Sequence, residues 1–168
     1  MSQRVLAREL DAAAWEPFGW LPRRDTDALD GSQTLHFEWQ DPHANVICHR
    51  ADEVPRTPKG MVCEMFFHHL THTQMLLVLN CPAVIAVAPA SCTFASAADL
   101  GAIRAFALRP LDTLVLHRGT WHWGPFPVDA QQVDMVNIQG MRYSEDNECA
   151  RLTDFAETVE VVPPLLRN

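Results

Sequence analysis

The stretch LVLHRGTWHWGPFPV, residues 114–128, decides the fold of this chain. An apolar run of the β type ends there in a tight turn, His117-Arg118-Gly119, and His122 follows five positions after His117. Glycine permits a sharp backbone turn, and a strand residue after it can point into the interior of a β-barrel. The stretch therefore predicts a functional site built on strands.

Short apolar segments recur along the rest of the chain between Pro, Gly, Asn and Asp, a pattern typical of an all-β barrel or sandwich. Helix signals are few, and nothing marks a domain boundary. We predict a single domain over residues 1–168. We expect short helices at residues 11–15, with Asp11 as the N-cap, and at 97–103. The expected strands cover residues 34–39, 44–50, 60–69, 74–79, 84–88, 104–108, 113–117 and 133–139.

Composition and charge exclude several classes of function. The formal net charge is -8, with 21 acidic against 13 basic residues, which argues against a nucleic-acid-binding surface. The longest apolar run, residues 75–90, is interrupted at Asn80, Cys81 and Pro82, so it is shorter than the roughly 20 residues that span a bilayer. The first 15 residues include charged ones where a signal peptide would be apolar, so we expect a cytoplasmic protein without membrane contact.

Strand alternation predicts which polar side chains share a surface. In residues 61–69, Phe67 and His69 fall on one face and His68 on the other. In residues 133–139, one face is apolar and then ends in Asn137 and Gln139. Polar groups inside a small barrel are costly unless they are hydrogen-bonded or metal-bound, so we expect a ligand cavity lined from several strands.

Two histidine motifs match cupin spacing. His117-x-Gly119-x-x-His122 resembles the second cupin motif, P-x-G-x-x-H, with histidine in place of proline. In the first motif, H-x-H followed by Glu, His69 takes the second histidine position, which puts Gln74 at the Glu position and Phe67 at the first histidine. This match predicts a divalent metal (Zn, Ni, Mn or Fe) on His69, Gln74 and His122, with His72 or His68 in place of the missing histidine. We assign no role to His36, His43 or His49.

Several further segments follow the pattern of one enzyme family. Trp15-Glu-Pro-Phe18-Gly19 is similar to that family's F-x-x-[YF]-G opening, and His49-Arg50-Ala51 to its strand ending in Arg-Ala. The segments that resemble R-H-P-L-[GS]-[TS]-Q, R-A-F and Y-H-R-x-V-W-H-H-P are residues 69–74, 104–106 and 117–122. With these segments, most of the chain resembles the ureidoglycolate lyase family of the cupin superfamily. The resemblance implies a jelly-roll β-barrel, a homodimer, and cleavage of ureidoglycolate into glyoxylate and urea.

The chain also departs from the family pattern. His68 replaces an arginine, Leu70 a proline and Trp123 a histidine. Leu29-Asp30 stands where the family has Asn-Asn, and Gln139-Gly140 where it has Asp-Arg. Several polar contacts of the family's site are thus replaced, each worth roughly 1–3 kcal/mol when buried.

The expected chemistry is elimination of urea from a small 2-hydroxy acid. Arg50 or Arg118 would hold the substrate carboxylate, and His69, His117 or His122 would move protons near neutral pH. Trp121 and Asn137 are predicted as further substrate contacts. Two alternatives stay open: a metal-dependent cupin dioxygenase or isomerase acting on a different small carboxylate, and a cupin that binds a small molecule without turnover.

Overall fold

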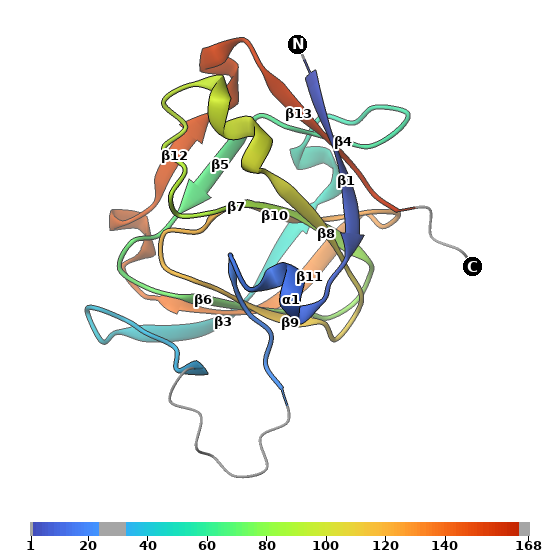
Figure 1. Ribbon diagram of the computed structural model, residues 1–168. Coiled ribbons are helices and arrows are strands. Elements are labelled where there is room, and N and C mark those ends of the chain that lie inside the picture. Colours follow the sequence, from blue (N-terminus) through green and yellow to red (C-terminus); the bar gives the residue numbers. More distant parts are fainter. Residues whose placement is uncertain (1, 24–32, 165–168) are drawn as a thin grey trace.

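The computed structural model describes residues 2–23 and 33–164, and its strands form two facing sheets (Figure 1). The larger sheet has the order β12 (Glu148–Arg151), β5 (Met65–His68), β10 (Trp121–Pro127), β7 (Ala83–Ala88), β8 (Arg104–Leu108), β1 (Ser2–Glu9), β13 (Thr158–Val162), β4 (Met61–Cys63). The smaller sheet has the order β2 (Gly19–Trp20), β9 (Thr113–Leu116), β6 (Gln74–Val78), β11 (Gln132–Gly140), β3 (Pro42–Arg50). This arrangement confirms the predicted all-β, cupin-like barrel.

Helical segments are short, as predicted. In α1 (Ala12–Trp15), the Ala14 amide donates to Asp11 Oδ1 at 2.9 Å, so Asp11 is the N-cap. The expected second helix is a 3-10 helix, η3 (Ala97–Ala102). Three further 3-10 turns join strands: η2 (Ala51–Glu53), η4 (Tyr143–Glu145) and η5 (Leu152–Phe155).

Strand β7 is buried on both faces, and its side chains divide the core into two layers. Val84, Ala86 and Ala88 belong to one cluster, which also holds Trp121 and Trp123. Ala83, Ile85 and Val87 belong to the other, which includes side chains of β6, β9 and β11 and so fills the space between the sheets. The continuous apolar sequence of β7 follows from this double burial, because both faces of the strand contact core.

Two expected strands were wrong. Residues 34–39 form no strand; Phe37 makes a single bridge to His72, and the chain then turns. Residues 60–69 form two strands, which part at Glu64: β4 pairs with β13, whereas β5 pairs with β10 and β12. The alternation prediction nevertheless holds within β5, where Phe66 and His68 are buried in the protein and Phe67 is less so.

Five strands were not expected: β1, β2, β10, β12 and β13. Strand β1 has three consecutive apolar residues, Val5 to Ala7, between Arg4 and Arg8, and it is paired in parallel on both sides, with β13 and with β8. Strand β10 contains Gly124, Pro125 and Pro127, which usually interrupt strands, and its register with β7 shifts between Trp123 and Phe126. The local sequence patterns of β1 and β10 are weak, and pairing with strands distant in sequence stabilises both.

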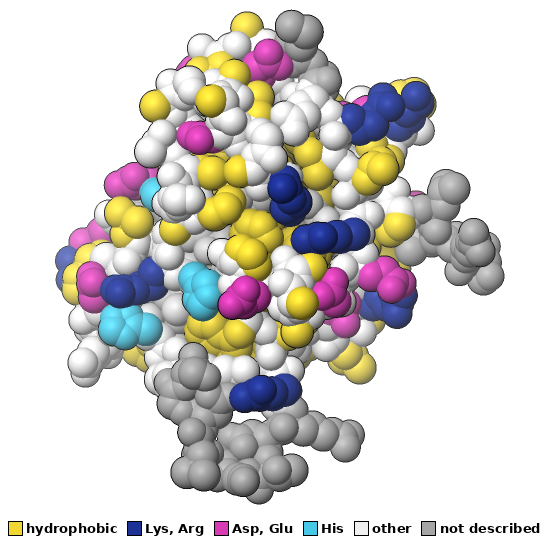
Figure 2. Space-filling model, in the orientation of Figure 1, with side chains coloured by type: hydrophobic (Ala, Val, Ile, Leu, Met, Phe, Trp, Pro, Cys, Tyr) yellow, Lys and Arg dark blue, Asp and Glu magenta, His cyan; other side chains and the backbone are white. Residues whose placement is uncertain are grey.

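The molecular surface carries mixed charge. On the face drawn in Figure 2, Lys and Arg side chains lie scattered among Asp and Glu and do not gather into one basic patch. Across residues 2–23 and 33–164, no helix is long and apolar enough to cross a membrane. The single domain over residues 1–168 stays a prediction.

Candidate active site

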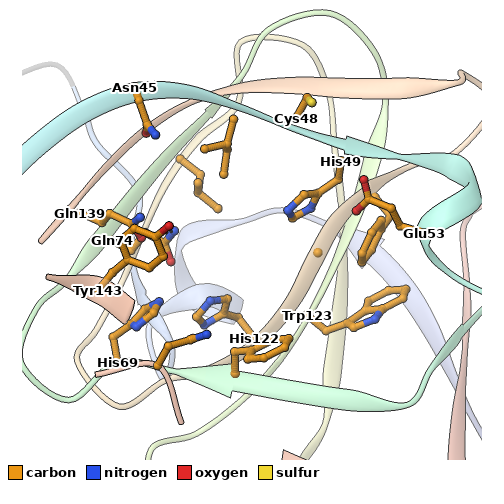
Figure 3. A pocket seen from close by; sticks show the side chains of 16 residues that line it. Asn45, Cys48, His49, Glu53, His69, Gln74, His122, Trp123, Gln139 and Tyr143 are labelled. Atoms are coloured by element: carbon orange, nitrogen blue, oxygen red, sulfur yellow. Dashed lines mark hydrogen bonds between the residues drawn. The ribbon is translucent and has the colours of Figure 1, made fainter. Parts of the chain in front are cut away.

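A cavity of about 470 Å³ opens where the apolar core between the two sheets ends (Figure 3). Strands β3, β5, β6, β10 and β11 all contribute to it, together with η2 and the segment around η4. Its apolar lining is Ile47, Phe67, Leu76, Trp123 and Phe126, with Gly124. Its polar lining is Asn45, Cys48, His49, Glu53, His69, Gln74, His122, Gln139, Tyr143 and Asn147.

His69 and His122 lie side by side on one wall, with ring centroids 5.4 Å apart. On β10, Trp121 packs in the outer core layer, which is the cluster that contains Val84, Ala86 and Ala88. The alternating position, His122, therefore faces the space between the sheets. His69 follows the end of β5, whose Phe67 is paired directly with His122. The motif histidines, distant in sequence, are therefore brought together as expected.

Gly119 joins these two elements. Its φ is +78°, and its amide donates to the His69 carbonyl at 2.6 Å. A Cβ at this position would stand 3.0 Å from the Ala90 Cβ. Both the left-handed backbone and the close approach favour glycine, so the predicted sharp turn is confirmed and it fixes the backbone of His69.

Both imidazoles are neutral at physiological pH. Burial, with the nearby His122 and His72 rings adding to it, lowers the pKa of His69 to about 3. Burial also lowers the pKa of His122 to about 4, although the hydrogen bond to the Thr120 carbonyl partly offsets it. His122 Nδ1 lies 3.1 Å from that carbonyl oxygen, so it carries the proton and leaves Nε2 as the basic atom.

A chain of side-chain amides forms a second wall, next to the histidines. Gln74 Nε2 donates to Asn137 Oδ1 at 2.9 Å and to Gln139 Oε1 at 3.3 Å. Asn137 Nδ2 then donates to Asn45 Oδ1 at 2.9 Å. Asn137 is fully buried behind Asn45 and Gln139, which themselves line the cavity. The polar end predicted for residues 133–139 therefore belongs to the cavity wall, with Asn137 as its support.

The other two histidines near this strand end contact carboxylates. His68 Nε2 lies 3.0 Å from Glu148 Oε2, and its ring stacks on Trp121 with a centroid distance of 3.6 Å. His72 Nδ1 lies 3.5 Å from Oδ2 of the buried Asp146. Asp146 also accepts hydrogen bonds from the Leu70 and Thr71 amides at 3.0 and 2.8 Å, so it anchors the segment that carries His69.

The sequence profile described as ureidoglycolate lyase matches residues 2–161. The chain belongs to the ureidoglycolate lyase family. Membership makes it an enzyme, a lyase, and the resemblance read from residues 15–19, 49–51, 69–74 and 104–122 is confirmed. No curated protein matches the chain.

The residues of this ureidoglycolate lyase family member fit a divalent metal only in part. Within the described ranges, no group of three or more His, Cys, Asp or Glu side chains is placed to hold an ion. His69 and His72 stack with their rings 24° from parallel, so their in-plane lone pairs do not converge. His68 is held by Glu148 and Trp121. Gln74 Oε1 and His69 Nδ1, however, are buried without hydrogen-bond partners, which leaves His69, Gln74 and His122 as the set that would hold a metal.

Besides Asn137, which supports the wall from behind, four residues predicted at the site lie outside this cavity. Arg50 forms a two-pronged ion pair with Asp52 on the surface, at 3.0 and 3.2 Å. Arg118 pairs with Glu38 at 2.9 Å, and both are well exposed. His117 is exposed and packs against Trp20. Trp121 is buried in the outer core layer, where Nε1 donates to the Cys92 carbonyl. Leu29-Asp30 lies outside the described residues.

Six polar residues of the cavity were not predicted: Asn45, Cys48, His49, Glu53, Tyr143 and Asn147. His49 was available from the sequence, because it alternates with Ile47 and Asn45 along β3, and all three line the cavity. The same alternation places Arg50 on the opposite face, as the structure shows. Glu53 and Tyr143 lie on the 3-10 turns η2 and η4, where strand alternation gives no direction.

Proposed function

We propose that this chain cleaves ureidoglycolate into glyoxylate and urea, with His122 and His69 as the proton-transfer residues. One observation carries the proposal: two buried, neutral imidazoles face an amide-lined cavity in a member of the ureidoglycolate lyase family. A volume of about 470 Å³ lies within the usual range for small-molecule sites.

The reaction needs one proton to be taken and one to be given. Neutral His122 Nε2 accepts the proton of the 2-hydroxyl group while the carbon–oxygen bond becomes a carbonyl. The carbon–nitrogen bond breaks, and its electron pair goes to the urea nitrogen. Because burial makes the imidazolium a strong acid, it returns the proton to that nitrogen, so glyoxylate and neutral urea are released.

His69 supports the same step from the neighbouring position. Its ring lies against His122, and its low pKa also keeps it neutral and able to accept a hydrogen bond. Trp123, Phe67 and Leu76 supply the apolar surroundings that keep these rings desolvated. The substrate hydroxyl would therefore sit between two acceptors without a competing charge.

Release of glyoxylate from ureidoglycolate tests the proposal. We expect the wild-type protein to release glyoxylate well above the spontaneous rate. A His69→Ala/His122→Ala double variant should release it at no more than the spontaneous rate. Glyoxylate release that does not exceed the spontaneous rate, with each of Zn, Ni, Mn and Fe supplied in turn, would remove this activity.

A bound divalent metal is a separate proposal, which rests on the unpartnered Gln74 Oε1 and His69 Nδ1. His69, Gln74 and His122 would hold the ion, which would polarise the hydroxyl and carboxylate oxygens of the substrate. Elemental analysis of protein prepared without chelators decides it. At least half an equivalent of one metal, lost in His69→Ala, supports it; under about a tenth of an equivalent, with no gain on reconstitution, rejects it.

A homodimer in the cytoplasm completes the proposal, and the oligomeric state is open to direct measurement of solution mass.

A further inference from the structure

The cavity has no fixed cation for a carboxylate. Among the described residues that line it, none is Lys or Arg, and Glu53 is its single carboxylate. Arg50, the nearest arginine in sequence to Glu53 on β3, is engaged with Asp52 outside the cavity. A substrate carboxylate must therefore be bound by neutral donors, and it must avoid the charge of Glu53.

One end of the cavity presents two free hydrogen-bond donors, beside the unpartnered Gln74 Oε1. Gln74 Nε2 uses its hydrogens on the oxygens of Asn137 and Gln139, and Asn137 Nδ2 uses one of its own on Asn45. The side-chain oxygens of Asn45 and Gln139 are therefore acceptors in these hydrogen bonds. Their amide nitrogens have no hydrogen-bond acceptor among the described residues, and both residues line the cavity. Two N–H donors are thus left for a ligand oxygen.

The other end presents acceptors. Glu53 Oε1 accepts the Arg50 amide at 3.0 Å, which fixes the carboxylate at the start of η2 and leaves Oε2 for a ligand. His49 Nδ1 lies 2.8 Å from the Pro125 carbonyl oxygen and stacks on Phe126. Since Nδ1 donates there, Nε2 is the ring atom of His49 that is left for a ligand.

These two ends are well separated. Asn45 and His49 are four residues apart on β3, which corresponds to roughly 13 Å along a strand. Figure 3 shows Gln139 and Asn45 toward one side of the cavity and His49 with Glu53 on the other, with the two motif histidines on a third wall. A ligand that bridges the ends meets donors at one terminus and acceptors at the other.

The geometry points to a fixed substrate orientation: Asn45 and Gln139 bind the carboxylate, and Glu53 binds the N–H groups of the ureido end. The inference rests on the proposed function for its substrate. Glu53 contributes twice, because it accepts from the ureido nitrogen and repels the carboxylate. The hydroxyl-bearing carbon, between the two ends, is then presented to His122.

Equilibrium binding of two unreactive ligands tests this orientation. N-carbamoylglycine has both ends of ureidoglycolate but lacks the 2-hydroxyl, and glycolate has the carboxylate and the hydroxyl but lacks the ureido group. Glu53→Gln keeps an oxygen for the Arg50 amide and removes the charge. We expect this variant to bind N-carbamoylglycine about fivefold more weakly, because a hydrogen bond to a charged acceptor is stronger than one to a neutral acceptor by about 1 kcal/mol. The affinity for glycolate should stay within about twofold of the wild-type value.

Two further variants complete the design. Asp52→Asn removes the neighbouring carboxylate of η2, which does not line the cavity, and should change neither affinity by more than about twofold. Asn45→Asp keeps the oxygen that accepts from Asn137 but replaces the free N–H donor with a negative charge. It should weaken both ligands by about tenfold or more.

The orientation is overturned if Glu53→Gln weakens glycolate as much as N-carbamoylglycine, or if it leaves both unchanged. It is also overturned if wild-type protein binds neither ligand at tens of millimolar, measured by calorimetry. Because no turnover is involved, the expected binding pattern in a protein that releases no glyoxylate would reject the proposed function and retain the orientation.

Discussion

Four histidines lie around the end of β5, and they divide into two pairs. His69 and His122 face the cavity, and burial lowers the pKa of both, although the charge of Asp146 partly opposes this at His69. The rings of His68 and His72 instead contact Glu148 and Asp146, and burial lowers the pKa of His72 as well. The comparison teaches that the contacts of an imidazole, rather than its place in a histidine-rich segment or a lowered pKa, separate a base that faces the cavity from an anchored structural side chain.

The largest expected effect is on catalysis. His122→Ala should lower kcat/KM for glyoxylate release by on the order of 100-fold or more, because it removes the proton acceptor. The matched change in the other pair, His68→Ala, should cost less than about fivefold, since His68 packs on Trp121 away from the cavity. Steady-state kinetics on folded variants measures both, and equal losses would erase the distinction between the pairs.

The next largest effect is expected on stability in acid. Each cavity histidine should lower the free energy of unfolding by about 2 kcal/mol when the pH is lowered from 7 to 5. The folded-state pKa values, about 3 and about 4, lie below the ordinary value of 6.5, so the unfolded chain binds more protons in that window. This stabilisation is complete above pH 6.5 and is lost as the pH falls toward 4.

Urea unfolding at pH 7 and pH 5 checks this dependence. Between pH 7 and pH 5, the free energy of unfolding of His122→Gln should fall by about 2 kcal/mol less than that of wild type. The free energy of unfolding of His117→Gln, a change at an exposed position, should fall as much as that of wild type. An unchanged loss in His122→Gln would mean that His122 is protonated in the folded state.

A smaller effect is expected at the turn that joins the two cavity histidines. Gly119→Ala places a Cβ 3.0 Å from the Ala90 Cβ at a φ of +78°, which should cost about 1–3 kcal/mol and lower the thermal unfolding midpoint by several degrees. Gly101 in η3 is the control, because a Cβ there meets nothing within 4 Å. Similar midpoints for Gly119→Ala and Gly101→Ala would show that the turn is not constrained.

The smallest effect is expected for the two arginines that the sequence assigned to the substrate carboxylate. Arg50 and Arg118 form exposed ion pairs with Asp52 and Glu38, which solvent screens. Arg50→Ala and Arg118→Ala should therefore change KM by less than about twofold. A tenfold rise in KM for either variant would return that arginine to the site.

Much of the fold follows from the sequence because short apolar runs and period-two patterns are local. Residues 84–88 and 104–108 were predicted as the strands β7 and β8, and residues 133–139 as β11. Strand β10 was not, because Gly124 and Pro125 interrupt its pattern, and pairing with β7 and β5 stabilises it instead. Residues 34–39 alternate without finding a strand partner beyond one bridge to His72.

The site was predictable where spacing or alternation fixes direction. The motif spacing identified His69 and His122, and alternation identified the wall that holds Asn137 and Gln139. Arg50 was chosen for its charge, although the alternation of β3 favours His49 as the inward side chain. Glu53 escapes sequence reasoning because it reaches the cavity from the 3-10 turn after β3.

The dependence of kcat/KM on pH for glyoxylate release tests the central claim, that neutral buried histidines move the protons. With pKa values of about 3 and about 4, the cavity histidines stay neutral throughout pH 5 to 8, so the account predicts a rate, corrected for the spontaneous reaction, that changes little across this range. A fall centred near pH 6.5 in protein that remains folded would contradict it, because the base would then be a histidine with an ordinary pKa.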